Sequence, residues 1–212
     1  MKKQICYLAG VLLIAACHSA PKELPILGPR EAVQKTVNGK TVTDTVYQTI
    51  PAFKFLNQDS AMIDNHTFDG KIYVADFFFT SCPTICPVMH RNLLKVYEKY
   101  KGHQEVMLLS HSIDFKYDIP HVLKKYADKL GITGTQWEFV HGSKEAVYTL
   151  AQKNYLVSVA QDAGQPGGYV HQGYLVLIDK EKRVRGAYDG TDEKQVEQMM
   201  KDMDTLLSAY TH

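Results

Sequence analysis

The apolar and polar positions after residue 41 follow an alternation of strands and helices. Residues 42–50 alternate loosely between apolar and polar, and residues 53–57 form a short apolar run, so each segment predicts a strand. Residues 71–79 are almost continuously apolar, which is typical of a strand buried on both faces. Shorter runs of the same kind at 106–109 and 137–140 predict two further buried strands.

Helical spacing separates these runs. A helix is predicted from Pro87 to near Gly102, and a second from the Asp118–Pro120 region to Gly131. Ser143 is a candidate N-cap of a third helix. Residues 164–168 form a glycine-rich loop, residues 173–178 and 184–188 predict a hairpin, and Thr191 or Asp192 caps a last helix.

This order of elements predicts an α/β fold with a central mixed sheet flanked by helices on both faces. With a dithiol at the end of an inner strand and extra strands at the N-terminus, the layout is thioredoxin-like. We assign the domain to residues 41–212. The methionines at 199, 200 and 203 lie along one stripe of the last helix and are interpreted as core.

The N-terminal residues have the pattern of an export signal. A positive Met1-Lys2-Lys3 is followed by about a dozen mostly apolar residues, too few to span a bilayer core of ~30 Å. The stretch ends in Ala15-Ala16-Cys17, which resembles a bacterial lipobox. We therefore expect a signal peptide at 1–16, lipid on Cys17, and a proline-rich tether over 17–40 that holds an exported domain outside the cytoplasm, on the periplasmic or extracytoplasmic side.

Composition narrows the partners and the role of the cysteines. With 24 basic and 23 acidic residues the net charge is +1, and no basic patch predicts nucleic-acid binding. Of four cysteines, Cys6 falls in the signal and Cys17 at the lipid site, which leaves Cys82 and Cys86. A disulfide between them closes too short a loop to contribute much chain entropy, so chemistry explains the pair better than stability.

Cys82 and Cys86 lie where the 71–79 strand ends and a helix begins. The free N–H groups and positive dipole of a helix start favour thiolate over thiol. Three residues separate the cysteines, one more than in the usual redox spacing. The wider loop relaxes the constraint that favours a tight disulfide, yet it lets two sulfurs converge on one soft ion such as Cu(I).

A third ligand would make such a site selective, and histidine supplies the candidates. His171 lies between a glycine-rich loop and an apolar strand, a junction that approaches the dithiol in a thioredoxin-like fold. His111 follows a buried strand, and His90 falls one turn into the helix after the cysteines. Spacing alone ranks His171 first and leaves all three open.

Three segments carry a family resemblance. The run from Phe79 to Pro87 resembles the F-T-x-C-P-x-x-C-P signature of the Sco/SenC copper proteins. Ser110–Asp114 with Asp118 is similar to the family's S-I-D-P-x-x-D segment, and Val170-His171-Gln172 to its distal histidine segment. The three segments occur in the same order as in the family, and the resemblance covers roughly residues 50–207.

The resemblance implies a thioredoxin-like fold and a copper site formed by Cys82, Cys86 and His171. It also implies a role, as copper donor, thiol reductant or both, in assembling the binuclear copper centre of cytochrome c oxidase. The partner would be the copper subunit of the oxidase or another copper- or thiol-bearing protein. Copper as Cu(I) or Cu(II) is the expected metal.

The segments also depart from the family pattern. Phe115 replaces a proline, Val170 an acidic residue and Gln172 a serine or threonine. These changes remove no ligand, but they affect the groups around the ligands. Asp114 and Asp118 are expected either to orient the site or a partner, or to cap the following helix.

Two other functions compete with copper handling. A thiol-disulfide oxidoreductase would use Cys82 and Cys86 as a redox-active dithiol and has no obvious need of His171. A peroxiredoxin-like peroxidase shares the layout and the Thr80-x-Cys82 approach, but the rest of such an active site finds no match in the chain.

Overall fold

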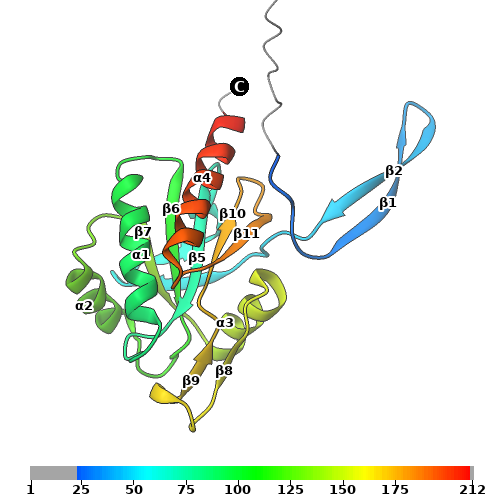
Figure 1. The fold of residues 1–212 in the computed structure, drawn as a ribbon. Coiled ribbons are helices and arrows are strands. Elements are labelled where there is room, and N and C mark those ends of the chain that lie inside the picture. Colours follow the sequence, from blue (N-terminus) through cyan, green and yellow to red (C-terminus); the bar gives the residue numbers. More distant parts are fainter. Residues whose placement is uncertain (1–22, 211–212) are drawn as a thin grey trace, which may run out of the picture.

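The computed structural model describes residues 23–210, and a seven-stranded mixed sheet forms their centre (Figure 1). The strand order is β11 (Val184–Asp189), β10 (Tyr174–Ile178), β5 (Ile72–Phe78), β6 (Val106–Ser112), β7 (Trp137–His141), β3 (Lys54–Asn57) and β4 (Met62–Asp64). Strands β5, β6 and β7 run parallel, and the strands outside them pair antiparallel. This confirms the predicted mixed sheet and its thioredoxin-like layout.

The two central strands are buried along their whole length. Every residue of β5 and of β6 is buried, as their apolar runs predict for strands covered on both faces. The register pairs Phe77 with His111 and Asp76 with Ser110, so alternate residues face opposite sides of the sheet. The carboxyl ends of β5 and β6 therefore lie together at one edge.

Helices cover both faces of the sheet. On one face lie α1 (Cys86–Lys99), α2 (Pro120–Leu130) and α4 (Glu193–Ala209); Phe78 of β5 packs against residues of α1 and α2, and Tyr100 after α1 hydrogen-bonds α4. On the other face lie α3 (Lys144–Leu150) and the π-helical turn η2 (Ala151–Tyr155), where Tyr155 contacts Phe77. Two short 3-10 turns complete the helical elements: η1 (Asn65–Phe68) and η3 (Pro166–Gly168).

The predicted helix starts are mostly confirmed. Ser143 caps α3 by accepting from the backbone N–H of Ala146, and Asp192, of the two alternatives, caps α4. The capping alternative for Asp118 is wrong, because Ile119 occupies the N-cap of α2 and the Asp118 carboxylate turns away to bond Thr80 and Ser112.

Four short or exposed strands had not been predicted. Besides β4, they are β8 (Val159–Gln161) and β9 (Tyr169–His171), which pair with each other and carry His171, and β1 (Arg30–Val37). Strand β1 pairs with β2 (Lys40–Tyr47) in a hairpin that projects from the body of the domain (Figure 1). Strand β1 therefore lies within the stretch predicted as a tether, residues 17–40.

The segment before the hairpin is attached to the sheet. The Arg185 guanidinium donates to the carbonyls of Leu24 and Pro25, and the N–H of Leu27 donates to the carbonyl of Val184. The predicted signal peptide and the predicted lipid site at Cys17 lie outside the described residues. Within residues 23–210, no helix combines the length and the apolar character that crossing a bilayer requires.

Candidate metal centre

The two cysteines lie at the edge where β5 ends and α1 begins. Cys86 is the first residue of α1 and Pro87 follows it, a position where the missing proline N–H costs no helical hydrogen bond. Cys82 lies in the loop before the helix, and backbone N–H groups at Thr84 and Cys86 point to its sulfur. Both cysteines are free thiols, 7% and 1% exposed.

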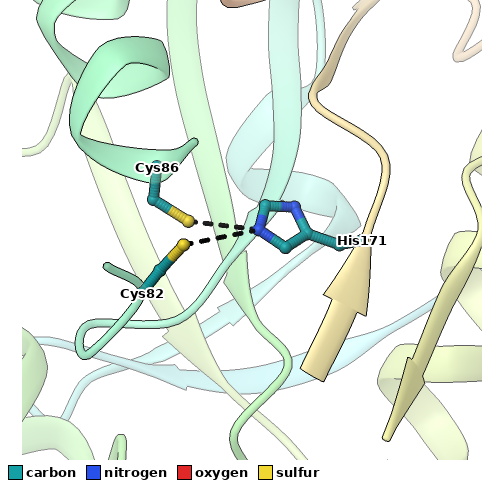
Figure 2. Close-up of side chains that lie close together, drawn as sticks. All are labelled: Cys82, Cys86 and His171. Carbon is teal, nitrogen blue, oxygen red and sulfur yellow. Dashed lines mark hydrogen bonds between the residues drawn. The ribbon is translucent and has the colours of Figure 1, made fainter. Parts of the chain in front are cut away.

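His171 comes to the same place from a distant part of the chain. Figure 2 shows its imidazole, carried by β9, facing the two sulfurs. Its Nε2 is 3.2 Å from Sγ of Cys86 and 4.0 Å from Sγ of Cys82. One donor atom from each of the three residues lies within 4.8 Å of the others. Among the described residues this is the one group of three or more such side chains that could hold an ion.

An aromatic ring and a glycine loop position the histidine. The ring of Phe79 packs edge-on to His171, with centroids 5.9 Å apart, and against Tyr169. Gly167 has φ +81, and a Cβ on it would lie 2.6 Å from the Phe79 ring. Only glycine fits this approach, so the loop before β9 can cover the ring. The sequence analysis noted the glycine-rich loop but not its contact with Phe79.

The pKa values of the two thiols are shifted in opposite directions. A hydrogen bond from Cys86 holds the pKa of Cys82 well below its usual range. The His171 contact and the backbone N–H groups of Cys86 and Thr84 act in the same direction, while burial opposes them. The same hydrogen bond, together with burial, raises the pKa of Cys86. Cys82 is therefore the thiolate of the pair and Cys86 the thiol.

The donor set fits a soft metal ion. Two sulfurs and one imidazole nitrogen match the preference of Cu(I) for thiolate and imidazole ligands. The other ring nitrogen, Nδ1 of His171, is buried without a hydrogen-bond partner. A carboxylate often orients a ligating histidine through that nitrogen. Here the neighbouring residue in the chain is the exposed Val170, and Nδ1 has no carboxylate partner among the described residues.

Asp118 fixes the start of the cysteine loop. Its carboxylate accepts from the N–H of Thr80 at 2.9 Å, from Oγ1 of Thr80 at 2.5 Å and from Oγ of Ser112 at 2.6 Å. Burial raises its pKa, and these three bonds oppose that rise. Asp114 instead accepts from the N–H groups of Lys116 and Tyr117 within its own turn.

His90 lies outside the thiol cluster, in a buried polar network. Its Nε2 is 3.0 Å from Asp76 and its Nδ1 2.8 Å from the hydroxyl of Tyr126. Ser110 donates to the same aspartate, and Trp137 to Ser110. Asp76 interrupts an apolar strand in the sequence, which is the signal that could have revealed this network.

His111 also lies outside the cluster. It is fully buried, neither ring nitrogen has a hydrogen-bond partner, and burial lowers its pKa to about 3. The rings of Phe53, Phe55, Phe77 and Tyr155 surround it. Of the three candidate histidines, only His171 reaches the cysteines.

Comparison with known proteins extends the match beyond this site. Residues 41–208 match the SCO1/SenC family. Over 167 residues the chain is 28% identical to the SCO1 protein homolog of Bacillus subtilis (strain 168). The aligned region covers 78% of this chain and 86% of the relative.

Two solved structures are similar over the same region. One is a SCO1/SenC family lipoprotein from Bacillus anthracis str. Ames, with a TM-score of 0.69, 30% identity, and coverage of 75% of this chain and 95% of that one. The other is BsSco, a member of the Sco family of cytochrome c oxidase assembly proteins in which a disulfide switch was identified. It has a TM-score of 0.66 at 28% identity and covers 74% and 92% of the two chains.

Proposed function

The chain belongs to the SCO1/SenC family, and on that premise we propose that it binds copper through Cys82, Cys86 and His171. Copper is its cargo. The protein handles it, by delivery, by thiol reduction or by both, in the assembly of the binuclear copper centre of cytochrome c oxidase. The partner is the copper subunit of the oxidase or another copper- or thiol-bearing protein.

One observation carries the proposal: Nε2 of His171 faces both sulfurs, although 85 residues separate the histidine from Cys86. A dithiol exchanger needs no imidazole in that place. The role of BsSco's family in assembling cytochrome c oxidase supports the choice of pathway.

The protonation of the two thiols suits a cargo site. Cys82 supplies a thiolate that can receive the ion at once, and Cys86 supplies a second sulfur that loses its proton as copper binds. His171 adds a neutral imidazole from a different element. Burial of all three side chains excludes water and competing ligands from the bound ion.

The test is a copper titration of residues 18–212 in the reduced form. Cu(I) and Cu(II) are added in turn and followed by absorbance and paramagnetic resonance. We expect one copper per chain and, with Cu(II), a thiolate-to-copper charge-transfer band. His171→Ala should weaken binding and shift this band, and Cys82→Ala/Cys86→Ala should abolish binding.

His121→Ala is the matched control, because His121 is exposed on α2 and has no part in the site. It should bind copper like the wild type. Stoichiometric binding by the double cysteine variant would contradict the assignment of the ligands.

A second function, thiol-disulfide exchange, is favoured by the lowered pKa of Cys82 beside a thiol that can resolve a mixed disulfide. The two functions are compatible, because the disulfide form cannot hold copper by its sulfurs. Oxidase assembly in a strain carrying His171→Ala separates them. Normal assembly would favour exchange, and failed assembly would favour copper handling.

We further propose that the protein is an exported lipoprotein, cut before Cys17 and acylated there, with its domain on the extracytoplasmic side of a bacterial membrane. The lipobox-like Ala15-Ala16-Cys17 and the lipoprotein relative from Bacillus anthracis support this. Mass spectrometry of the mature N-terminus tests it. We expect diacylglycerol on Cys17 and release of Cys17→Ala from the membrane fraction.

A further inference from the structure

The β1–β2 hairpin is the part of the described structure that the copper proposal does not use. It projects from the body on the side away from β9 and the cysteine loop (Figure 1). In the described residues its two strands pair only with each other. The match to the SCO1/SenC family begins at residue 41, so β1 lies outside it.

The local sequence explains why the hairpin forms. Asn38 and Gly39 connect the strands, with φ values of 51 and 75. Positive φ at both turn residues matches the twist of a two-residue hairpin, and Asn-Gly is the pair that adopts it most readily. A two-stranded hairpin exposed on both faces is nevertheless only marginally stable in water. Something covering one face would stabilise it.

The two faces differ in chemistry. The register places opposite residues on the same face, so each face has four cross-strand pairs. The first, the threonine face, has Arg30 as its one charged residue; its pairs are Arg30/Tyr47, Ala32/Thr45, Gln34/Thr43 and Thr36/Thr41. The second, the valine face, joins one valine to one charged residue in every pair: Glu31/Val46, Val33/Asp44, Lys35/Val42 and Val37/Lys40.

The valines of this face remain accessible. Val37, Val42 and Val46 are 51%, 41% and 47% exposed. Apolar side chains repeated along one face of a hairpin mark a surface that another element can cover.

The charges on the valine face are ordered along the hairpin. Acidic Glu31 and Asp44 lie in the half near the body, and basic Lys35 and Lys40 in the half near the turn. Lys35 and Asp44 form an ion pair within the hairpin. Glu31 and Lys40, at opposite ends, have no ion-pair partner among residues 23–210.

This order makes the valine face complementary to itself. When two copies pack face to face and antiparallel about a twofold axis, the body-side half of one meets the turn-side half of the other. The Glu31/Val46 pair of each copy then meets the Val37/Lys40 pair of the other, which brings Glu31 diagonally opposite Lys40, and the four valine-bearing pairs of one hairpin meet those of its mate. Packing in the parallel direction would instead place like charges together.

We propose that the valine face of the β1–β2 hairpin joins two copies of this chain in an antiparallel twofold contact. Four pairs bury less than the ~800 Å² per partner of a standard interface, so the dimer is weak in dilute solution. It forms where the full chain is concentrated, because two copies held at one membrane have a high effective concentration.

Zero-length cross-linking of the full chain in membranes tests the proposal. Two copies with different affinity tags are expressed together and treated with a carbodiimide, which joins a carboxylate to an amine in direct contact. Within one hairpin Glu31 and Lys40 are about 20 Å apart, at ~3.4 Å per residue over six positions, so a Glu31–Lys40 link must join two chains. We expect that link, and co-purification of the two tags after denaturation.

Charge reversal separates the proposal from a folding defect. Glu31→Lys alone and Lys40→Glu alone place like charges opposite each other, and each should reduce cross-linking at least tenfold. Co-expression of the two variants makes every facing pair opposite in sign and should restore tag pairing. Thr43→Lys, which adds a charge to the threonine face, is the matched control and should leave cross-linking unchanged.

Absence of tag pairing in the wild type would overturn the proposal, and so would pairing that survives in both single variants. A hairpin covered by lipid or by the body of its own chain gives the first of these results. Copper titration of the same variants keeps the two proposals apart, since the hairpin lies away from the cysteines and copper binding should be unchanged.

Discussion

The carboxylate of Asp118 hydrogen-bonds the backbone of Thr80, which lies 38 positions earlier in the chain and two residues before Cys82. It accepts from the N–H at 2.9 Å and from the side-chain hydroxyl at 2.5 Å. A third bond, from Ser112, ties the same carboxylate to the end of β6. The cysteine loop is thus fixed to the neighbouring strand by one buried acid.

Asp118→Asn should loosen this loop. The amide keeps a single acceptor oxygen where the carboxylate accepts three hydrogen bonds, and bonds to a charged group contribute about 1.5–3 kcal/mol each. We expect the free energy of unfolding to fall by about 3 kcal/mol and copper affinity to fall with it. Urea denaturation and copper titration measure the two effects.

Asp114→Asn is the comparison, because the Asp114 carboxylate accepts from the N–H groups of Lys116 and Tyr117 in its own turn and from the hydroxyl of Tyr169, and within the described residues it makes no hydrogen bond to the cysteine loop. Its loss should be about 1 kcal/mol, with copper affinity close to that of the wild type. Equal losses of stability and of copper affinity in the two variants would contradict the role given to Asp118 in fixing the cysteine loop.

Gly167→Ala should displace the loop that carries His171. The added Cβ would lie 2.6 Å from the Phe79 ring, in addition to the strain of a positive φ. Gly168→Ala is the matched control, since it has the same φ of +81 and nothing within 4 Å of its Cβ. We expect both variants to lose about 1 kcal/mol from backbone strain and only Gly167→Ala to lose copper affinity. Identical copper titrations of the two variants would contradict the role given to Phe79.

Much of this arrangement follows from sequence pattern. Continuous apolar runs identified β5, β6 and β7, because strands buried on both faces leave no polar alternation. The same runs placed Cys82 and Cys86 at the junction of a strand and a helix, and a family resemblance selected His171 from three candidates.

The rest depended on contacts that no local pattern contains. Strands β8 and β9 are three residues each, too short for a periodicity to emerge. The exposed hairpin has no buried face, although Asn38-Gly39 was a hairpin signal that the sequence analysis missed. Asp118 was ambiguous because the same side chain could cap the adjacent helix or reach a distant loop, and only the packed sheet brings Thr80 within its range.

His111 predicts an acid-sensitive fold. Burial lowers its folded-state pKa to about 3, against ~6.5 in the unfolded chain. Its contribution is therefore complete above pH 6.5 and is lost as pH falls toward 3, because the unfolded chain takes up a proton that the folded one excludes. Between pH 6.5 and 5 the loss is about 2 kcal/mol, at 1.36 kcal/mol per pH unit.

His111→Leu should remove that part of the pH dependence. Urea denaturation at pH 7 and pH 5 gives the difference for each protein, and the variant's difference should be smaller than the wild type's by about 2 kcal/mol. His121→Leu, at an exposed position, serves as control and should behave as the wild type. An unchanged difference in His111→Leu would mean that other groups cause the acid sensitivity.

Arg185 should matter more for stability than any surface ion pair. Its guanidinium is 5% exposed, donates to Asp179 at 2.9 Å and holds the carbonyls of Leu24 and Pro25. Arg185→Met leaves the fully buried carboxylate of Asp179 without its best-shielded partner, and breaking such a pair costs about 3–5 kcal/mol.

Arg183 contacts the same carboxylate at 2.8 Å but is 26% exposed, and its guanidinium bonds Asp179 and Glu181 but makes no hydrogen bond to the described N-terminal segment, residues 23–29. Arg183→Met should therefore cost less, about 1 kcal/mol. Limited proteolysis adds a second readout, since only Arg185→Met frees residues 24–27 and should speed cleavage there. If the two variants were equally stable and equally resistant, the Leu27–Val184 bridge and the packing of Leu24 and Leu27 against the core would hold the N-terminal segment, and the buried guanidinium would be dispensable.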